Sequence, residues 1–139
     1  MTDTRVRRRA SADGGFTLIE LLVVMILIVV LASIVLVQYG NAVTRSKEAV
    51  LKQDLFRMRE AIDEYYADKN KYPPSLEALA EDKYIRSVPV DPFTNSADTW
   101  QEITADPDPG SPGAEIGISD VKSGSDATAL DGTPYAEWE

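Results

Sequence analysis

The most constraining feature of the sequence is an uninterrupted apolar run near its N-terminus. Residues 21–37 are seventeen residues of which only Ser33 is polar, and counting from Phe16 gives twenty-two, with Thr17 and Glu20 as further exceptions. As an α-helix this stretch is about 33 Å long, enough to cross the hydrocarbon core of a bilayer. A chain of 139 residues could hardly bury a helix that is apolar on every face, so we expect a membrane anchor.

Charge is distributed unevenly around this run. The formal net charge is −9, and residues 87–139 carry eleven acidic side chains against the single base Lys122, which argues against nucleic-acid binding. Four arginines within residues 1–15 precede the run and favour a cytoplasmic N-terminus with the rest of the chain outside. The sequence has no cysteine and no histidine, which excludes disulfides, thiolate nucleophiles and histidine-based catalysis.

Two features of the run leave alternatives open. A secretory signal peptide also starts with basic residues, but its apolar stretch is shorter, and Ala32 and Ser33 supply only a weak cleavage site. Glu20 is an acid near the start of a membrane helix, where an unpaired charge is costly. It either stays solvated at headgroup depth or pairs with a cation. No base lies nearby on the same helical face, so such a cation would come from elsewhere.

The residues around Glu20 resemble a known motif. Gly14-Gly15 is followed by Phe16-Thr17-Leu18-Ile19-Glu20 and the apolar run, after a short basic leader. This order is similar to the prepilin signature of the family of type IV pilins and type II secretion pseudopilins. The resemblance implies cleavage by a prepilin peptidase between Gly15 and Phe16, N-methylation of Phe16, and pairing of Glu20 with the N-terminal amine of a neighbouring subunit. Residues 1–15 would be the leader peptide, and residues 16–40 the transmembrane and filament-core helix.

One residue departs from the family pattern. Most members have a proline about twenty-two residues into the mature chain, and here that position is Val37. Proline would kink the helix, so its absence implies a straighter helix or one that unwinds elsewhere, with Gly40-Asn41 as the candidate.

Residues 41–72 are predicted to continue the helix as an amphipathic stalk that ends before Pro73-Pro74. Its apolar stripe, expected to pack on the chain's own head, is Leu51, Leu55, Met58, Ile62 and Tyr65. Residues 73–139 would form a globular head. The elements expected there are a helix over residues 76–81 capped by Ser75, and strands over residues 100–104 and 115–121. The predicted fold class is α+β, a long N-terminal helix packed on a small head with a short helix and a small antiparallel sheet.

The head is similar to that of the major pseudopilins of type II secretion. The similarity rests on Tyr72-Pro73, on Pro89-Val90-Asp91-Pro92-Phe93 and on residues 118–126 followed by Trp138. It implies a structural filament subunit that polymerises through its N-terminal helix and helps to export folded proteins across the outer membrane. The alternative is a type IV pilin subunit for adhesion, motility or DNA uptake. An anchored enzyme would need a catalytic cluster, and the head sequence offers none, so we expect no enzymatic activity.

The resemblance also implies partners and a location. The expected partners are further copies in a helical homo-oligomeric filament, the prepilin peptidase, other pseudopilins and an inner-membrane assembly platform, with no nucleic acid. The subunit would cross the inner membrane once, with its N-terminus cytoplasmic and its head periplasmic. It would then assemble into a periplasmic or surface filament.

The C-terminal tail is a candidate calcium site. It gathers oxygen donors at Ser123, Ser125, Asp126 and Asp131, and Ca²⁺ binds six to eight such oxygens in irregular geometry. Aspartates near glycines in a loop are more often simple turn residues. The resemblance favours calcium, with Asp126 and Asp131 as the acids and the two serines as further oxygen donors, although the two acids are closer in sequence than is usual in the family.

Overall fold

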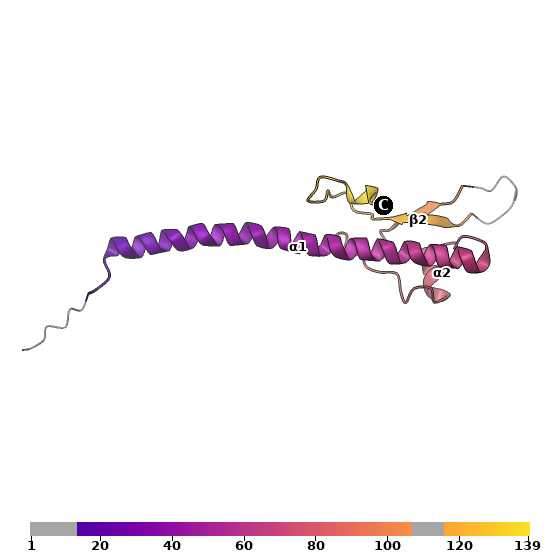
Figure 1. Cartoon of the computed structure of the whole chain (residues 1–139), viewed down its shortest axis with the longest axis horizontal. Helices are drawn as coiled ribbons and strands as arrows, with labels where there is room; N and C mark the ends of the chain where they lie inside the picture. Colours follow the sequence, from indigo (N-terminus) through magenta and orange to yellow (C-terminus); the bar gives the residue numbers. More distant parts are fainter. Residues whose placement is uncertain (1–13, 107–115) are drawn as a thin grey trace, which may run out of the picture. The chain divides into compact units, whose positions relative to one another are not determined.

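The computed structural model describes residues 14–106 and 116–139. The chain divides into two compact units, Met1–Gln38 and Tyr39–Glu139. The elements, in chain order, are α1 (Leu18–Lys69), α2 (Leu76–Glu81), β1 (Gln101–Thr104), β2 (Ile118–Lys122) and the 3-10 helix η1 (Tyr135–Glu137) (Figure 1). A long N-terminal helix, a short helix and a two-stranded antiparallel sheet confirm the predicted α+β class.

Helix α1 is a single helix of 52 residues. It begins two residues later than predicted because Thr17 caps it, the Thr17 hydroxyl accepting a hydrogen bond from the Glu20 N–H at 3.2 Å. The helix continues through Gly40, so it does not unwind at that candidate break. It ends at Lys69 because Asn70 adopts a left-handed conformation (φ 51°), which asparagine tolerates.

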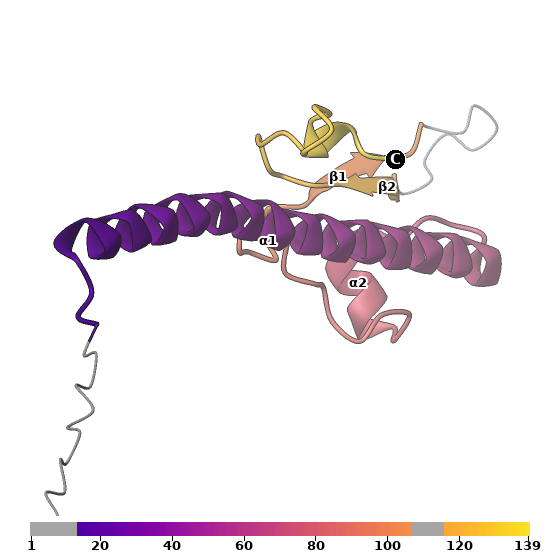
Figure 2. The ribbon, with the colours of Figure 1, turned by 60° about the vertical axis from the view of Figure 1, so that its left-hand side comes forward.

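The stalk part of α1 supplies one face of the core of the second unit. The whole predicted stripe is buried, each side chain 4 % exposed or less: Leu51, Leu55, Met58, Ile62 and Tyr65. Helix α2 and strand β2 bring their own buried side chains to the same cluster, and α2 and the strand pair lie on different sides of the stalk (Figure 2). Burying each large apolar side chain contributes about 1.5–3 kcal/mol, so this stripe is what attaches the head to the helix.

Helix α2 has the predicted bounds and the predicted cap. The Ser75 hydroxyl accepts a hydrogen bond from the Ala78 N–H at 3.3 Å. The Leu76 N–H, another free amide of the first turn, donates to a Glu102 carboxylate oxygen at 2.9 Å. Because Glu102 belongs to β1, this hydrogen bond also fixes α2 relative to the sheet.

Strands β1 and β2 pair antiparallel, with Gln101 opposite Lys122 and an irregularity between Ile103 and Thr104. The second predicted strand begins only at Ile118. The residue before it, Gly117, passes so close to Tyr72 that a Cβ there would lie 2.6 Å from the Tyr72 main chain. A glycine is therefore required by this close approach.

Candidate functional site

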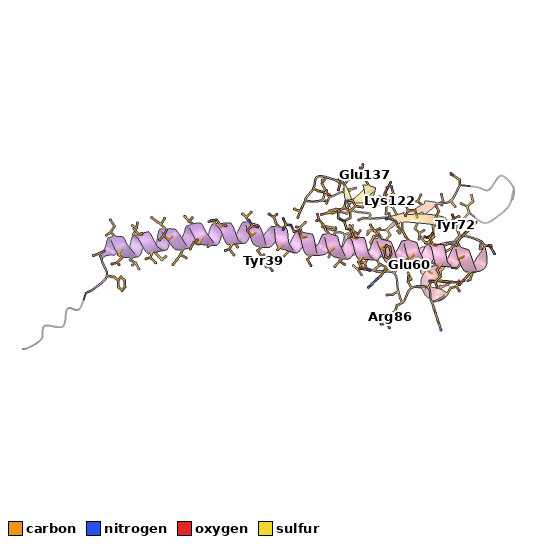
Figure 3. All side chains as sticks on the ribbon, viewed as in Figure 1. Tyr39, Glu60, Tyr72, Arg86, Lys122 and Glu137 are labelled. Carbon is orange, nitrogen blue, oxygen red and sulfur yellow. The ribbon has the colours of Figure 1, made fainter. Side chains whose placement is uncertain are left out.

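The N-terminal part of α1 is exposed along its length among the residues that the structure describes. Every residue from 18 to 37 is exposed, and the large apolar side chains range from 46 % exposed at Val24 to 85 % at Leu18. Figure 3 shows these side chains projecting all around the helix. The Ser33 hydroxyl donates to the Val29 carbonyl oxygen at 2.8 Å, so this polar group is satisfied within the helix. This surface is long and apolar enough to span a membrane, and only lipid or another protein could bury it.

Glu20 lies in the first turn of α1, where a negative charge interacts favourably with the helix dipole. The described residues form two ion pairs, Arg59–Asp120 and Lys69–Asp82, and neither involves Glu20. A cation that paired with the Glu20 carboxylate would therefore have to come from outside these residues.

The bond between Gly15 and Phe16 lies just outside the helix. Among the described residues, no atom beyond the adjoining residues lies within 4 Å of the position that a Cβ would occupy at Gly14 or Gly15, and Phe16 is 83 % exposed. The Leu21 N–H donates to the Thr17 carbonyl oxygen at 3.1 Å, which places the start of the helical hydrogen bonds beyond this bond. The Gly15–Phe16 bond is thus open to a protease.

The carboxylate of Glu48, in the stalk, forms hydrogen bonds to the C-terminal segment. A Glu48 oxygen accepts hydrogen bonds from the Leu130 N–H at 2.8 Å and from the Tyr135 hydroxyl at 3.1 Å. Burial, with the neighbouring Glu48, raises the pKa of the Tyr135 hydroxyl to about 12. The Tyr135 ring stacks on Phe93 with 4.0 Å between centroids. The two hydrogen bonds join residues more than eighty positions apart in sequence, and no local pattern in the sequence predicts them.

A buried carboxylate, Asp91, fixes the loop before β1 to the C-terminal segment. It is 0 % exposed; one oxygen accepts the Phe93 N–H at 2.8 Å, and the other accepts the Ser123 hydroxyl at 2.5 Å. The next residue, Gly124, passes so close to Thr99 that a Cβ would lie 1.8 Å from its carbonyl oxygen. In the sequence Asp91 stands out only as part of a motif, and Ser123 as a candidate calcium ligand. In the structure the Ser123 hydroxyl completes the hydrogen bonding of Asp91.

The other residues predicted to bind calcium are differently placed. Ser125 is buried, and its hydroxyl accepts the Ala127 N–H at 3.2 Å. Asp126 and Asp131 are both exposed. One oxygen of Asp131 accepts hydrogen bonds from the hydroxyl and the N–H of Thr133, which lower the pKa of that carboxyl. Within the described residues, no three acidic side chains gather as a metal site. An ion here would therefore rely on the two exposed carboxylates and on main-chain oxygens.

Arg59 is another important residue that the sequence did not reveal. Its Nε donates to the Asp120 carboxylate at 2.7 Å, and its Nη2 donates to the carbonyl oxygens of Val121 and Trp138. One side chain thereby ties the stalk to β2 and to the C-terminal end. Its only sequence signal is a basic residue beside the buried Met58, which many solvated helix faces share.

Comparison with known proteins identifies the family. A model described as the prokaryotic N-terminal methylation motif matches residues 11–36, a range that contains Gly15, Phe16 and Glu20. The chain is 33 % identical over 99 residues to the type II secretion system core protein G of Pseudomonas aeruginosa, covering 60 % of this chain and 70 % of that protein. It is 32 % identical to the Escherichia coli protein of the same name, covering 63 % of this chain and 72 % of that protein. The chain belongs to the family of type II secretion system core protein G.

Membership of the core protein G family confirms the resemblance drawn from residues 14–22 and from the head. A fimbrial protein of Eikenella corrodens, EcpC, is also similar, with 35 % identity over 100 residues that cover 68 % of this chain and 63 % of EcpC. No solved structure matches the chain significantly.

Proposed function

We propose that this core protein G family member is a structural filament subunit of a type II secretion system. Two observations support this role together. The family is that of a secretion-system core protein, and the N-terminal helix presents an apolar surface that is exposed within the described part of the chain. In the membrane, lipid would surround this surface. In a filament, the same helices of neighbouring subunits would replace the lipid, because apolar surface is removed from water either way. Extension of such a filament would help to move folded proteins across the outer membrane.

Processing of the leader would prepare the subunit for assembly. A prepilin peptidase would cleave between Gly15 and Phe16, and the new Phe16 amine would be methylated. The accessibility of this bond supports the proposal. Glu20 would then pair with the terminal amine of a neighbouring subunit, in surroundings where water is scarce and opposite charges attract strongly. The absence of a cationic partner for Glu20 among the described residues is consistent with an intermolecular one.

The arginines of residues 1–15 favour an N-terminus in the cytoplasm, a single crossing of the inner membrane and a head in the periplasm. Other pseudopilins and an inner-membrane assembly platform would be the partners there. The role proposed is structural, and the charged groups Arg59 of the stalk and Asp91 of the head hold parts of the fold together through hydrogen bonds.

Deletion of the gene, followed by complementation, tests the function. Wild-type chain should restore both secretion and periplasmic filaments. Glu20→Ala should still enter the membrane but fail to form filaments, whereas Glu60→Ala, which removes an exposed acid of the stalk, should behave as wild type. Loss of surface pili with normal secretion would contradict the secretion role and favour a fimbrial one.

We also propose that the loop carrying Asp126 and Asp131 binds calcium. Two exposed carboxylates on one short loop, next to main-chain carbonyl oxygens, support the proposal, since calcium prefers such oxygens. Bound calcium would neutralise charge in the acidic C-terminal region. Thermal unfolding of the detergent-solubilised chain, followed by tryptophan fluorescence, should shift upward with calcium and not with magnesium. The Asp126→Asn variant should lose that shift, and an identical melting curve with calcium and with chelator would refute the site.

A further inference from the structure

Thr17 stands between the bond that we propose is cleaved and the body of the anchor helix. Its hydroxyl accepts the Glu20 N–H at 3.2 Å, and its carbonyl oxygen accepts the Leu21 N–H at 3.1 Å. Both hydrogen bonds close the first turn, so α1 begins at Leu18. Threonine is a favoured N-cap residue, and replacing it with alanine destabilises this way of starting a helix.

The residue at which the helix begins decides whether the Gly15 carbonyl oxygen accepts a helical hydrogen bond. In an α-helix each carbonyl oxygen accepts the N–H four residues later. If α1 began two residues earlier, the Gly15 carbonyl oxygen would accept the Ile19 N–H. The Gly15–Phe16 bond would then be part of the helix, and a protease would have to unwind it. With the helix capped at Thr17, this bond lies in non-helical chain, and within the described residues a Cβ at Gly14 or Gly15 would meet no atom beyond the adjoining residues.

We propose that Thr17 is a positioning residue for leader removal, because its cap holds the start of α1 one residue beyond itself and leaves the Gly15–Phe16 bond outside the helix for the peptidase. In the hydrolysis, water adds to the Gly15 carbonyl carbon and the carbon–nitrogen bond breaks. A carboxylate remains on Gly15 and a protonated amine on Phe16. The inference rests on the proposed processing and assigns to Thr17 a conformational task in it.

Gly14 and Gly15 act in the same direction as the cap. Glycine is unfavourable inside a helix because it loses the most backbone freedom there. The two glycines resist extension of the helix toward the leader, and Thr17 terminates it from the other side. We therefore expect the cleavage rate to depend mainly on whether residue 17 has a hydroxyl group that caps the helix, and less on the size of its side chain.

The test follows leader removal from the full chain in membrane vesicles that contain a prepilin peptidase, by gel shift and mass spectrometry over time. Thr17→Ala removes the cap and adds a strong helix former, so its initial rate should fall about fivefold, the population change expected from a typical cap. Thr17→Ser keeps the hydroxyl and should be cleaved at nearly the wild-type rate.

A rescue variant separates helix position from direct recognition of Thr17 by the peptidase. Proline is tolerated at the first helical position and disfavours helix at the residue before it. Leu18→Pro added to Thr17→Ala should therefore restore the start of the helix and the cleavage rate. If the double variant stays as slow as Thr17→Ala although Leu18→Pro alone is cleaved normally, the positioning role is refuted.

The remaining outcomes distinguish this inference from the function on which it rests. An uncleaved wild-type chain would refute the proposed processing itself. A wild-type chain cut between Gly15 and Phe16, together with a Thr17→Ala variant cut equally fast, would leave the processing intact and refute only the role of the Thr17 cap.

Discussion

The two parts of helix α1 have the same backbone conformation and opposite surfaces. Over residues 18–37 apolar side chains occupy every face, and none of these is buried within the described part of the chain. After Tyr39 one apolar stripe is buried against the head, while charged side chains and a few exposed apolar ones, such as Val50 and Phe56, occupy the other faces. A helix that is apolar all round needs a partner from outside its chain, whereas an amphipathic helix can be satisfied by its own head. Within one helix, the first part therefore has a surface suited to assembly with other molecules, and the second part has a surface suited to folding against its own head.

The largest expected effect comes from paired methionine substitutions in the two parts. Met58 is 0 % exposed and Met25 is 56 % exposed. Met58→Ala should lower the free energy of unfolding of the head by about 2–5 kcal/mol, because it leaves a cavity in the core. Met25→Ala should change that free energy by less than about 0.5 kcal/mol. Denaturant unfolding in detergent, read from Trp100 and Trp138 fluorescence, measures both. Equal losses of unfolding free energy in the two variants would contradict a buried stalk stripe and an exposed anchor.

A charge introduced into each part of α1 tests whether only the first part lies in the membrane. Val29 and Val50 are 62 % and 48 % exposed in the isolated chain. Val29→Arg should cost about 3 kcal/mol of membrane insertion if the anchor lies in lipid, whereas Val50→Arg should be inserted normally. Carbonate extraction of membranes measures the integrated fraction. Normal integration of the Val29→Arg chain would contradict a membrane position for this part of the helix.

Arg59 and its neighbour Arg57 test what attaches the head to the stalk besides apolar burial. Arg59→Met removes hydrogen bonds to Asp120, Val121 and Trp138. Because the ion pair is partly exposed, we expect a loss of about 1–2 kcal/mol in head stability. Arg57→Met, at an exposed position, should have little effect. The same unfolding assay applies, and equal losses in both variants would show that general charge, not these contacts, matters.

The smallest expected effect concerns the contact between Tyr135 and Glu48. Tyr135→Phe should cost about 1 kcal/mol, the usual value for one hydrogen bond. The folded pKa of Tyr135 is raised from 10.0 to about 12, so its contribution is complete below pH 10 and is lost as the pH rises toward 12. Wild-type chain should therefore lose more stability than Tyr135→Phe between these pH values. Parallel curves for the two proteins would contradict this assignment.

A feature of the structure could be predicted from the sequence when the residues that form it are close together along the chain. The anchor, the buried stripe of the stalk, α2 with its Ser75 cap and the presence of two strands were all predicted, because periodicity and caps are local signals. The start of α1 at Leu18 was missed by two residues, although Thr17 is a readable cap. The roles of Arg59 and Glu48 were missed because their partners lie more than sixty residues away in sequence.

The sequence by itself determined that this chain carries a membrane-length apolar helix, a prepilin-like start and an amphipathic stalk. Each of these depends on which residues follow one another along a few turns, and helical geometry converts that order directly into a surface. Only the tertiary structure decided which groups the tail residues contact. Ser123, expected among calcium ligands, completes the hydrogen bonding of buried Asp91, and Gly124 lies against Thr99. A buried carboxylate needs hydrogen-bond donors, and its donors can come from distant parts of the sequence that the fold brings together. The spacing of residues in the sequence therefore does not show which donors these are.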